Sequence, residues 1–354
     1  MMIWPSFDEY TSHYITAYKM IRRFFPHIKI CGGGCEYNNT LFVPFLEMCR
    51  KNNCMPDIVT IRSFAAISPG EEKNGLKLIG NNECFYLAVS GDEQYLTHGA
   101  AEARRLMEQH GAGQCFLAAE EWSNNIWQRD LCNDTCYKSA YIFKSVIENG
   151  EAYDGLGYFA IGDQMDEVPP TPELFHGGFG LFTKNGLAKS AFRAMELLVR
   201  MGQRNLAQTE ACLITDTSDE IQIFLYNYVH YDILYRYRHT VNISPTDRYN
   251  VFNDDRDHTF NIVLQGLMPG QHRITTYGIS PEDGSVYDAW IHMGAPKQLS
   301  HYEEKYLKRM SWPGYFVEEK AVDGDLNLQL TLKPHEVVLL TILKEGEPIE
   351  NCKK

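Results

Sequence analysis

Two adjacent glutamates end an apolar segment of the chain and are followed at once by aromatic and amide side chains. The segment reads CFLAAEEWSNN over residues 115–125, so Glu120 and Glu121 directly precede Trp122. A carboxylate can attack or stabilise an oxocarbenium-like centre, an aromatic ring can stack on a sugar face, and amides can bind hydroxyl groups. The combination is compatible with a sugar-cleaving site, but paired glutamates at strand ends are common on plain protein surfaces, and from composition alone the surface interpretation is favoured.

The apolar run before these glutamates predicts a strand over residues 115–122. In a parallel barrel, the residues at the C-terminal ends of the strands face the active site. Successive side chains of a strand point to opposite faces, so only one of Glu120 and Glu121 is expected to point inward.

The elements around this strand alternate between helix and strand. Helices are expected at 10–25, 41–51, 97–110, 134–149 and 185–201, and strands at 27–31, 56–64, 115–122 and 155–163. Such alternation predicts parallel strands with crossover helices. From about residue 210 the chain instead shows short apolar or alternating runs between turn residues, typical of an antiparallel sandwich. The predicted domains are therefore an α/β domain, residues 1–205, and an all-β sandwich domain, residues 206–354.

Composition narrows the classes of partner. The chain has 354 residues and a formal net charge of -13, which argues against nucleic-acid and anionic-membrane partners and suits an uncharged sugar. No run of 18 apolar residues and no basic-then-apolar leader is visible, so we expect a cytoplasmic protein. The ten cysteines, including Cys132 and Cys136, lack metal-ligand spacing. No metal or cofactor is expected.

The glutamate segment resembles the catalytic-nucleophile block of glycoside hydrolase family 39, the β-xylosidase family. That family ends its seventh barrel strand with Thr-Glu-Trp/Phe-Asn and continues with His-Asp-Thr and an Ala-Ala-Tyr-Ile helix. Here the corresponding stretches are EEWS at 120–123, NDT at 133–135 and SAYI at 139–142. The resemblance implies a retaining hydrolase whose nucleophile is Glu121.

Further blocks resemble the same family in the same order. HIKICGGG at 27–34 is similar to its fifth strand, the stretch 157–192 to its eighth-strand block with the run FHGGFGL at 175–181, and YDAWIHMGAP at 287–296 to its accessory β domain. The resemblance implies these substrate-binding residues: Trp122, Phe159, Asp163, Asp166, Glu167 and His176. The three acids could equally be solvated loop acids, and His176 could instead hold the Gly-Gly turn, which is the favoured interpretation.

Some positions depart from the family pattern. Glu120 replaces a threonine, Ser123 replaces an asparagine, and Arg62 stands where a sixth-strand histidine is usual. A permanent guanidinium cannot change its charge as an imidazole can. Arg62 could select an acidic sugar such as a uronate, but pairing with a neighbouring carboxylate is favoured.

The family's acid/base motif, Asn-Glu-Pro after the fourth strand, has no match in this chain. The nearest acids, Asp8 and Glu9, lie where a helix is expected to start, which favours a capping role. Four βα units are recognisable, and a closed barrel has eight. The chain is therefore expected to be a partial (β/α)8 TIM-type barrel, strands 5–8, lacking the first half of the catalytic domain. A truncated gene product, a separately encoded N-terminal half and a misassigned start all remain open.

The predicted function is that of a retaining β-xylosidase-like hydrolase acting on xylo-oligosaccharides, incomplete because the acid/base glutamate is absent. The alternative is an inactive carbohydrate-binding or regulatory remnant of such an enzyme. The expected partners are an oligosaccharide substrate and either the missing N-terminal half or a second copy of the chain.

Overall fold

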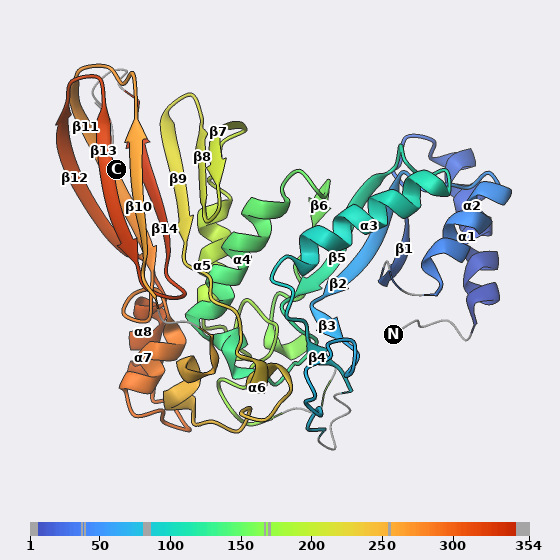
Figure 1. Ribbon diagram of the computed structural model, residues 1–354, viewed down its shortest axis with the longest axis horizontal. Coiled ribbons are helices and arrows are strands. Elements are labelled where there is room, and N and C mark those ends of the chain that lie inside the picture. Colours follow the sequence, from blue (N-terminus) through green and yellow to red (C-terminus); the bar gives the residue numbers. More distant parts are fainter. Residues whose placement is uncertain are drawn as a thin grey trace. The chain divides into compact units, whose positions relative to one another are not determined.

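The computed structural model describes residues 6–36, 38, 40–80, 86–165, 168, 171–253 and 256–344. These residues form two compact units (Figure 1). Unit 1 contains residues 1–73, 87–126 and 148–159, and unit 2 contains residues 74–86, 127–147 and 160–354.

Unit 1 is built on a parallel sheet of four strands in the order β1-β2-β5-β6. Its strands are β1 (Cys31–Glu36), β2 (Ile58–Phe64), β5 (Phe116–Ser123) and β6 (Gly155–Leu156). The helices of the unit are α1 (Phe7–Phe24), α2 (Phe42–Lys51) and α3 (Tyr95–Gln109), and two short strands, β3 (Ala66–Ile67) and β4 (Ala88–Val89), pair with each other. The predicted alternation of helices and parallel strands is confirmed.

The start of α1 follows from its sequence. Ser6 is the N-cap, and its hydroxyl accepts a hydrogen bond of 3.1 Å from the backbone N–H of Glu9. Asp8 and Glu9 lie in the first turn, where negative charge favours the helix dipole. The helix start predicted at these two acids is confirmed, with Ser6 as the capping side chain.

One face of the unit 1 sheet is fully buried. Val59 and Ile61 on β2, and Leu117 and Ala119 on β5, have no exposed surface. Helix α3 packs on both of these strands, and α2 packs on β1 (Figure 1). The alternation of buried apolar residues therefore fixes which side chains of β2 and β5 remain on the opposite face.

Two strand predictions need correction. The strand predicted over 27–31 lies over Cys31–Glu36 instead, so the glycine run is part of β1 and not a turn after it. A Cβ at Gly33 would lie 2.5 Å from the carbonyl oxygen of Thr60 on β2, so this close pairing requires glycine. The predicted strand 155–163 is reduced to two residues of β6. Residues 160–162 pair with the loop around 179–182 instead, as in the 3.0 Å bond from Leu181 N–H to the Ala160 carbonyl.

Unit 2 contains two antiparallel sheets. The larger has the order β12-β11-β14-β9-β8-β7, and the smaller pairs β10 with β13. The strands are β7 (Arg204–Thr209), β8 (Cys212–Asp216), β9 (Glu220–Tyr226), β10 (His258–Leu264), β11 (Gly270–Ile279), β12 (Gly314–Val322), β13 (Leu326–Leu332) and β14 (Val337–Leu343). The prediction of an α/β part followed by an antiparallel β part is thus confirmed.

The described helices of unit 2 lie before and between these strands in the chain. They are η1 (Leu131–Asp134), α4 (Cys136–Asn149), η2 (Asp163–Met165), α5 (Ser190–Leu198), α6 (Ile233–Arg236), η3 (Pro245–Val251), α7 (Val286–His292) and α8 (His301–Met310). Of α4, the residues up to 147 belong to unit 2. Among the described residues, no helix is both long and apolar enough to cross a membrane.

The sequence did not predict β7, β12 or α7. All six residues of β7 are exposed, and both β7 and β12 are edge strands, so neither carries the apolar run that announces a central strand. Helix α7 is short and begins at Ser285, whose hydroxyl accepts from the N–H of Asp288 at 3.2 Å.

Candidate functional site

The sequence-predicted nucleophile lies at the C-terminal end of β5, next to an irregularity in the strand. In the pairing of β2 with β5, Ile61 is opposite Ala119 and Arg62 is opposite Glu121, so Glu120 is an extra residue on β5. A β-bulge of this kind re-aims side chains and is common beside active sites. The bulge breaks the strict alternation that the sequence predicted for the two glutamates.

Both glutamates consequently reach the same side chain. The Arg62 Nε lies 3.6 Å from Glu120 Oε1 and 3.3 Å from Glu121 Oε2. The exposed fractions are 32% for the Arg62 side chain, 35% for Glu120 and 26% for Glu121. The favoured pairing of Arg62 with neighbouring carboxylates is therefore confirmed, while the expectation that only one glutamate points inward stays a prediction.

A third carboxylate stands across the sheet from Arg62. Glu36 at the end of β1 is its register partner. Burial raises the pKa of Glu36 above its ordinary value, and the positive charge of Arg62 opposes that rise. Three carboxylates and one guanidinium thus meet at the C-terminal ends of three neighbouring parallel strands.

The aromatic residues beside this cluster are less accessible. Trp122 has no exposed surface and packs edge-on against Tyr158, with ring centroids 5.5 Å apart at 81°. Phe159 is half-buried. A sugar can stack only on an open ring face, so the substrate-binding roles of Trp122 and Phe159 stay predictions, with Phe159 the more accessible of the two.

Asp163 lies in unit 2, in a fully buried ion cluster. The Lys189 Nζ is 2.5 Å from Asp134 Oδ1 and 2.8 Å from Asp163 Oδ1, and none of these three side chains is exposed. Burial raises the pKa of Asp163, with Lys189 opposing. Burial works to lower the pKa of Lys189, but the two aspartates outweigh it and the pKa lies above its usual value. The cluster therefore holds one more carboxylate than it has cations.

This cluster anchors the glycine-rich run at 175–181. Gly177 N–H donates to Asp134 Oδ2 at 2.7 Å, Gly180 N–H donates to Asp163 Oδ1 at 2.9 Å, and the Lys189 ammonium donates to the Gly178 carbonyl at 3.1 Å. These bonds occupy Oδ1 of Asp163, whereas its Oδ2 is buried without a hydrogen-bond partner among the described residues. The predicted role of Asp163 as an acceptor of sugar hydroxyls stays a prediction.

His176 belongs to the same run and is 8% exposed. A Cβ at Gly178 would lie 3.0 Å from its Nε2 and 2.5 Å from Asp163 Oδ1. Its place against the glycine turn favours the turn-holding interpretation over substrate contact. Asp166 and Glu167, the other two predicted acids, lie outside the described residues.

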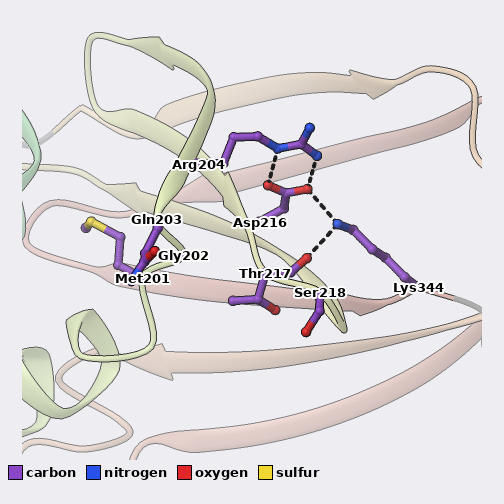
Figure 2. Close-up of a pocket in the computed structure, with 8 residues that line it drawn as sticks. All are labelled: Met201, Gly202, Gln203, Arg204, Asp216, Thr217, Ser218 and Lys344. Atoms are coloured by element: carbon purple, nitrogen blue, oxygen red, sulfur yellow. Dashed lines mark hydrogen bonds and ion pairs between the residues drawn. The ribbon is translucent and has the colours of Figure 1, made fainter.

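A polar hollow that the sequence did not predict lies in unit 2 at the β7–β8 hairpin (Figure 2). It has a volume of about 690 Å³, and Arg204 and Lys344 converge there on Asp216. The Arg204 Nε donates to Asp216 at 2.8 Å and the Lys344 Nζ donates to it at 2.5 Å. Arg204 first, and then Lys344, hold the pKa of the Asp216 carboxyl far below its usual range. A carboxylate held by two cations cannot act as a nucleophile or base, so this hollow is not the reactive site.

Among the described residues, no group of three or more His, Cys, Asp and Glu side chains is arranged to hold a metal ion. The chemistry available around Glu121 is that of carboxylates and a guanidinium.

Comparison with known proteins identifies the family. The model of glycosyl hydrolases family 39 matches residues 3–327. The chain belongs to glycosyl hydrolase family 39. The resemblance drawn from the EEWS and FHGGFGL stretches is thereby confirmed.

Relatives within family 39 are longer than this chain. A beta-xylosidase of Geobacillus stearothermophilus is 22% identical over 343 residues, covering 95% of this chain and 61% of that protein. A beta-xylosidase of Caldicellulosiruptor saccharolyticus is 28% identical over 239 residues, covering 63% of this chain and 43% of its own length. The chain thus spans less than two thirds of either protein.

A family 39 fold is also seen among solved structures. A monomeric beta-xylosidase from Caulobacter crescentus CB15 superimposes with a TM-score of 0.80 at 19% sequence identity, over 96% of this chain and 66% of that one. At such identity the likeness establishes the fold, and the roles of individual residues depend on the geometry described above.

Proposed function

We propose that the chain acts as a retaining glycosidase of the β-xylosidase type, with Glu121 as the nucleophile. The observation that carries the proposal is the position of Glu121: a quarter-exposed carboxylate at the C-terminal end of a parallel strand, 3.3 Å from a guanidinium, in a family 39 chain. A carboxylate must be ionised to act as a nucleophile, and the positive charge of Arg62 favours the ionised form of Glu121.

The proposed reaction has two steps. An Oε of Glu121 attacks the anomeric carbon, the bond to the leaving oxygen breaks, and that oxygen takes a proton from an acid. Water then displaces Glu121 from the glycosyl-enzyme and returns the anomeric configuration to that of the substrate. The beta-xylosidase relatives suggest a xyloside as the substrate.

We also propose that strands β1, β2, β5 and β6 correspond to strands 5–8 of a (β/α)8 barrel, with domains at 1–205 and 206–354. The parallel order β1-β2-β5-β6 and the covering helices support this assignment. The acid that protonates the leaving group would then come from strand 4 of the completed barrel.

The test is turnover of a panel of aryl glycosides by the wild-type chain and by Glu121→Gln. We expect the variant to lose at least ~10³-fold in kcat, because the covalent intermediate cannot form. Glu102→Gln on α3 is the matched control, since Glu102 is exposed and pairs only locally with Arg105. Glu121→Gly with added azide is expected to give a glycosyl azide of inverted configuration. Turnover that survives Glu121→Gln would refute the assignment.

A second candidate function is carbohydrate binding without turnover. The guanidinium of Arg62 beside Glu121 favours it, because a carboxylate engaged in an ion pair is a weaker nucleophile. Calorimetry with xylo-oligosaccharides separates the two functions. Heat of binding together with no release of an aryl leaving group, and no labelling of Glu121 by a 2-deoxy-2-fluoro-xyloside, would support the binding protein.

A further inference from the structure

Two β-bulges lie side by side on the strands that flank Arg62. On β1, the pairing with β2 shifts between Gly33 and Cys35, which makes Gly34 the extra residue. On β5, the extra residue is Glu120. Gly34 has a φ of 72°, a conformation that favours glycine, and a Cβ there would lie 3.1 Å from Glu120 Oε1. The space left by the missing side chain is therefore occupied by the Glu120 carboxylate.

Arg62 lies between the two carboxylates that the β5 bulge brings together. Its Nε is 3.3 Å from Glu121 and 3.6 Å from Glu120, both longer than the 2.7–2.9 Å typical of a charge-assisted hydrogen bond. The three side chains are also a quarter to a third exposed, and ion pairs with such exposure add little to stability. The Arg62 side chain is therefore expected to contribute little to the stability of the fold.

The same arrangement is well suited to setting the charge and direction of a reactive carboxylate. Arg62 orients Glu121 and favours its ionised form. Glu120 also attracts the guanidinium, so the attraction between Arg62 and Glu121 is weaker than in an isolated pair. A guanidinium bonded at full strength to the nucleophile would reduce its reactivity, and an uncompensated Glu120 would repel it. Two residues that depart from the family pattern, Arg62 and Glu120, thus contact each other and offset each other.

We propose that Gly34, Arg62 and Glu120 form one positioning unit for Glu121, in which Glu120 balances Arg62 and Gly34 leaves room for Glu120. The inference rests on the proposed nucleophilic role of Glu121. It assigns a joint function to Arg62 and Glu120, the two residues that depart from the family pattern. It predicts that Glu121 keeps its reactivity only when both residues are present or both are replaced.

Several other titratable groups face this unit and stay unchanged in every variant below. Glu36 is the register partner of Arg62 on β1, and the Cys35 thiol next to it senses the charges of Glu120 and Arg62. Tyr10 of α1 senses Glu120. Burial raises the pKa of Cys35 to about 11 and also raises that of Tyr10, so both remain neutral across the working range of pH.

The test is a double-mutant cycle that exchanges both residues for the family types: Arg62→His, Glu120→Thr, and the two together. The first readout is the titration of the Glu121 side-chain carboxyl carbon by NMR, which needs no turnover. For this readout Arg62→Met replaces Arg62→His, because an imidazole is itself protonated at the pH at which a glutamate ordinarily titrates. We expect the midpoint to rise in Arg62→Met, to fall in Glu120→Thr, and to return towards the wild-type value when these two substitutions are combined. Unmoved midpoints, or shifts that do not offset each other, overturn the inference.

The second readout is the rate at which a 2-deoxy-2-fluoro-xyloside labels Glu121, together with kcat and KM for an aryl xyloside. Each single variant is expected to lose about 10-fold in labelling rate and kcat with KM little changed, and the double variant to recover to within ~3-fold. Single losses that simply multiply in the double variant would overturn the inference.

The two readouts keep the failures apart. Offsetting midpoints without any labelling would support the positioning unit and reject the nucleophile. Labelling with unmoved midpoints would keep the nucleophile and reject the unit. The control pair is Arg104 and Asp154, which also lies in unit 1 with 2.6 Å between the charged atoms. Arg104→His is expected to leave the Glu121 midpoint in place.

Discussion

The molecule contains two clusters with the same charges and opposite character. In unit 1, Arg62 lies between Glu120 and Glu121 at 3.6 and 3.3 Å, and all three side chains are partly exposed. In unit 2, Lys189 lies between Asp134 and Asp163 at 2.5 and 2.8 Å, with no exposed surface on any of them. In each cluster one cation forms ion pairs with two carboxylates, and in unit 1 Glu36 adds a third carboxylate that is affected by the charge of Arg62.

The difference between the clusters shows how solvent decides what such a group can do. When a buried ion pair loses one partner, the remaining charge is buried without compensation and the protein is destabilised. The Lys189 cluster is therefore expected to stabilise the fold. A solvated cluster adds little to stability and can lose or gain a partner at small cost. The exposed cluster is therefore the one that can take part in a reaction.

The largest expected effect tests the structural half of this comparison. Lys189→Met removes the cation and leaves two buried carboxylates facing each other, so we expect unit 2 to lose about 3–5 kcal/mol of unfolding free energy. Denaturant titration measures the loss. Arg104→Met, at the partly exposed Arg104–Asp154 pair, is the control and should cost no more than about 1 kcal/mol. Equal losses in the two variants would remove the distinction between dry and solvated clusters.

A somewhat smaller effect concerns Asp288, a buried carboxylate bonded to hydroxyl groups. It accepts from Ser285 and, at 2.9 Å, from the hydroxyl of Tyr249, and burial raises its pKa from 3.8 to about 6. A carboxyl whose folded pKa is raised adds stability that is fully present below pH 3.8 and is lost as the pH rises to about 6.

We expect Asp288→Asn to remove up to about 3 kcal/mol of this pH dependence, which is the shift converted at about 1.4 kcal/mol per pH unit. Thermal unfolding of the wild type and the variant between pH 4 and pH 7 provides the measurement. Parallel stability curves for the two proteins would contradict the assignment.

A small effect tests the reactive half of the comparison. Arg62→Met should change the unfolding free energy of unit 1 by no more than about 1 kcal/mol, because all three side chains of this cluster are partly exposed. Denaturant titration beside Lys189→Met provides the contrast. A loss as large as that of Lys189→Met would show that Arg62 is structural and would break the comparison.

The smallest effect is expected at the reverse arrangement, in which two cations share Asp216. Arg204 is 70% exposed, so Arg204→Ala should lower the midpoint of thermal unfolding by a few degrees at most, and added salt should reduce the difference. An undiminished difference in high salt would indicate a role other than the ion pair.

The sequence predicted the elements of unit 1 and the position of Glu121 at a strand end because both follow from hydrophobic periodicity and from the family pattern. It could not predict the bulge at Glu120, since an extra residue in a strand is visible only against its partner strand. It also placed Asp163 among loop acids, because the burial of a carboxylate depends on a lysine 26 residues away. Edge strand β7 was missed because all six of its residues are exposed, and β12 because the charged stretch 318–320 interrupts its apolar residues.

The run of glycines at 177, 178 and 180 shows why the family was recognisable. Cβ atoms at these positions would collide with the backbone of Asp130 and Gly162 and with the Asp163 carboxylate, so no larger residue fits. A segment under such crowding tolerates almost no substitution, whatever happens to the reactive groups elsewhere in the chain. The glycine run therefore indicates membership of the family, and it would be retained equally in a family member that had lost its catalytic activity.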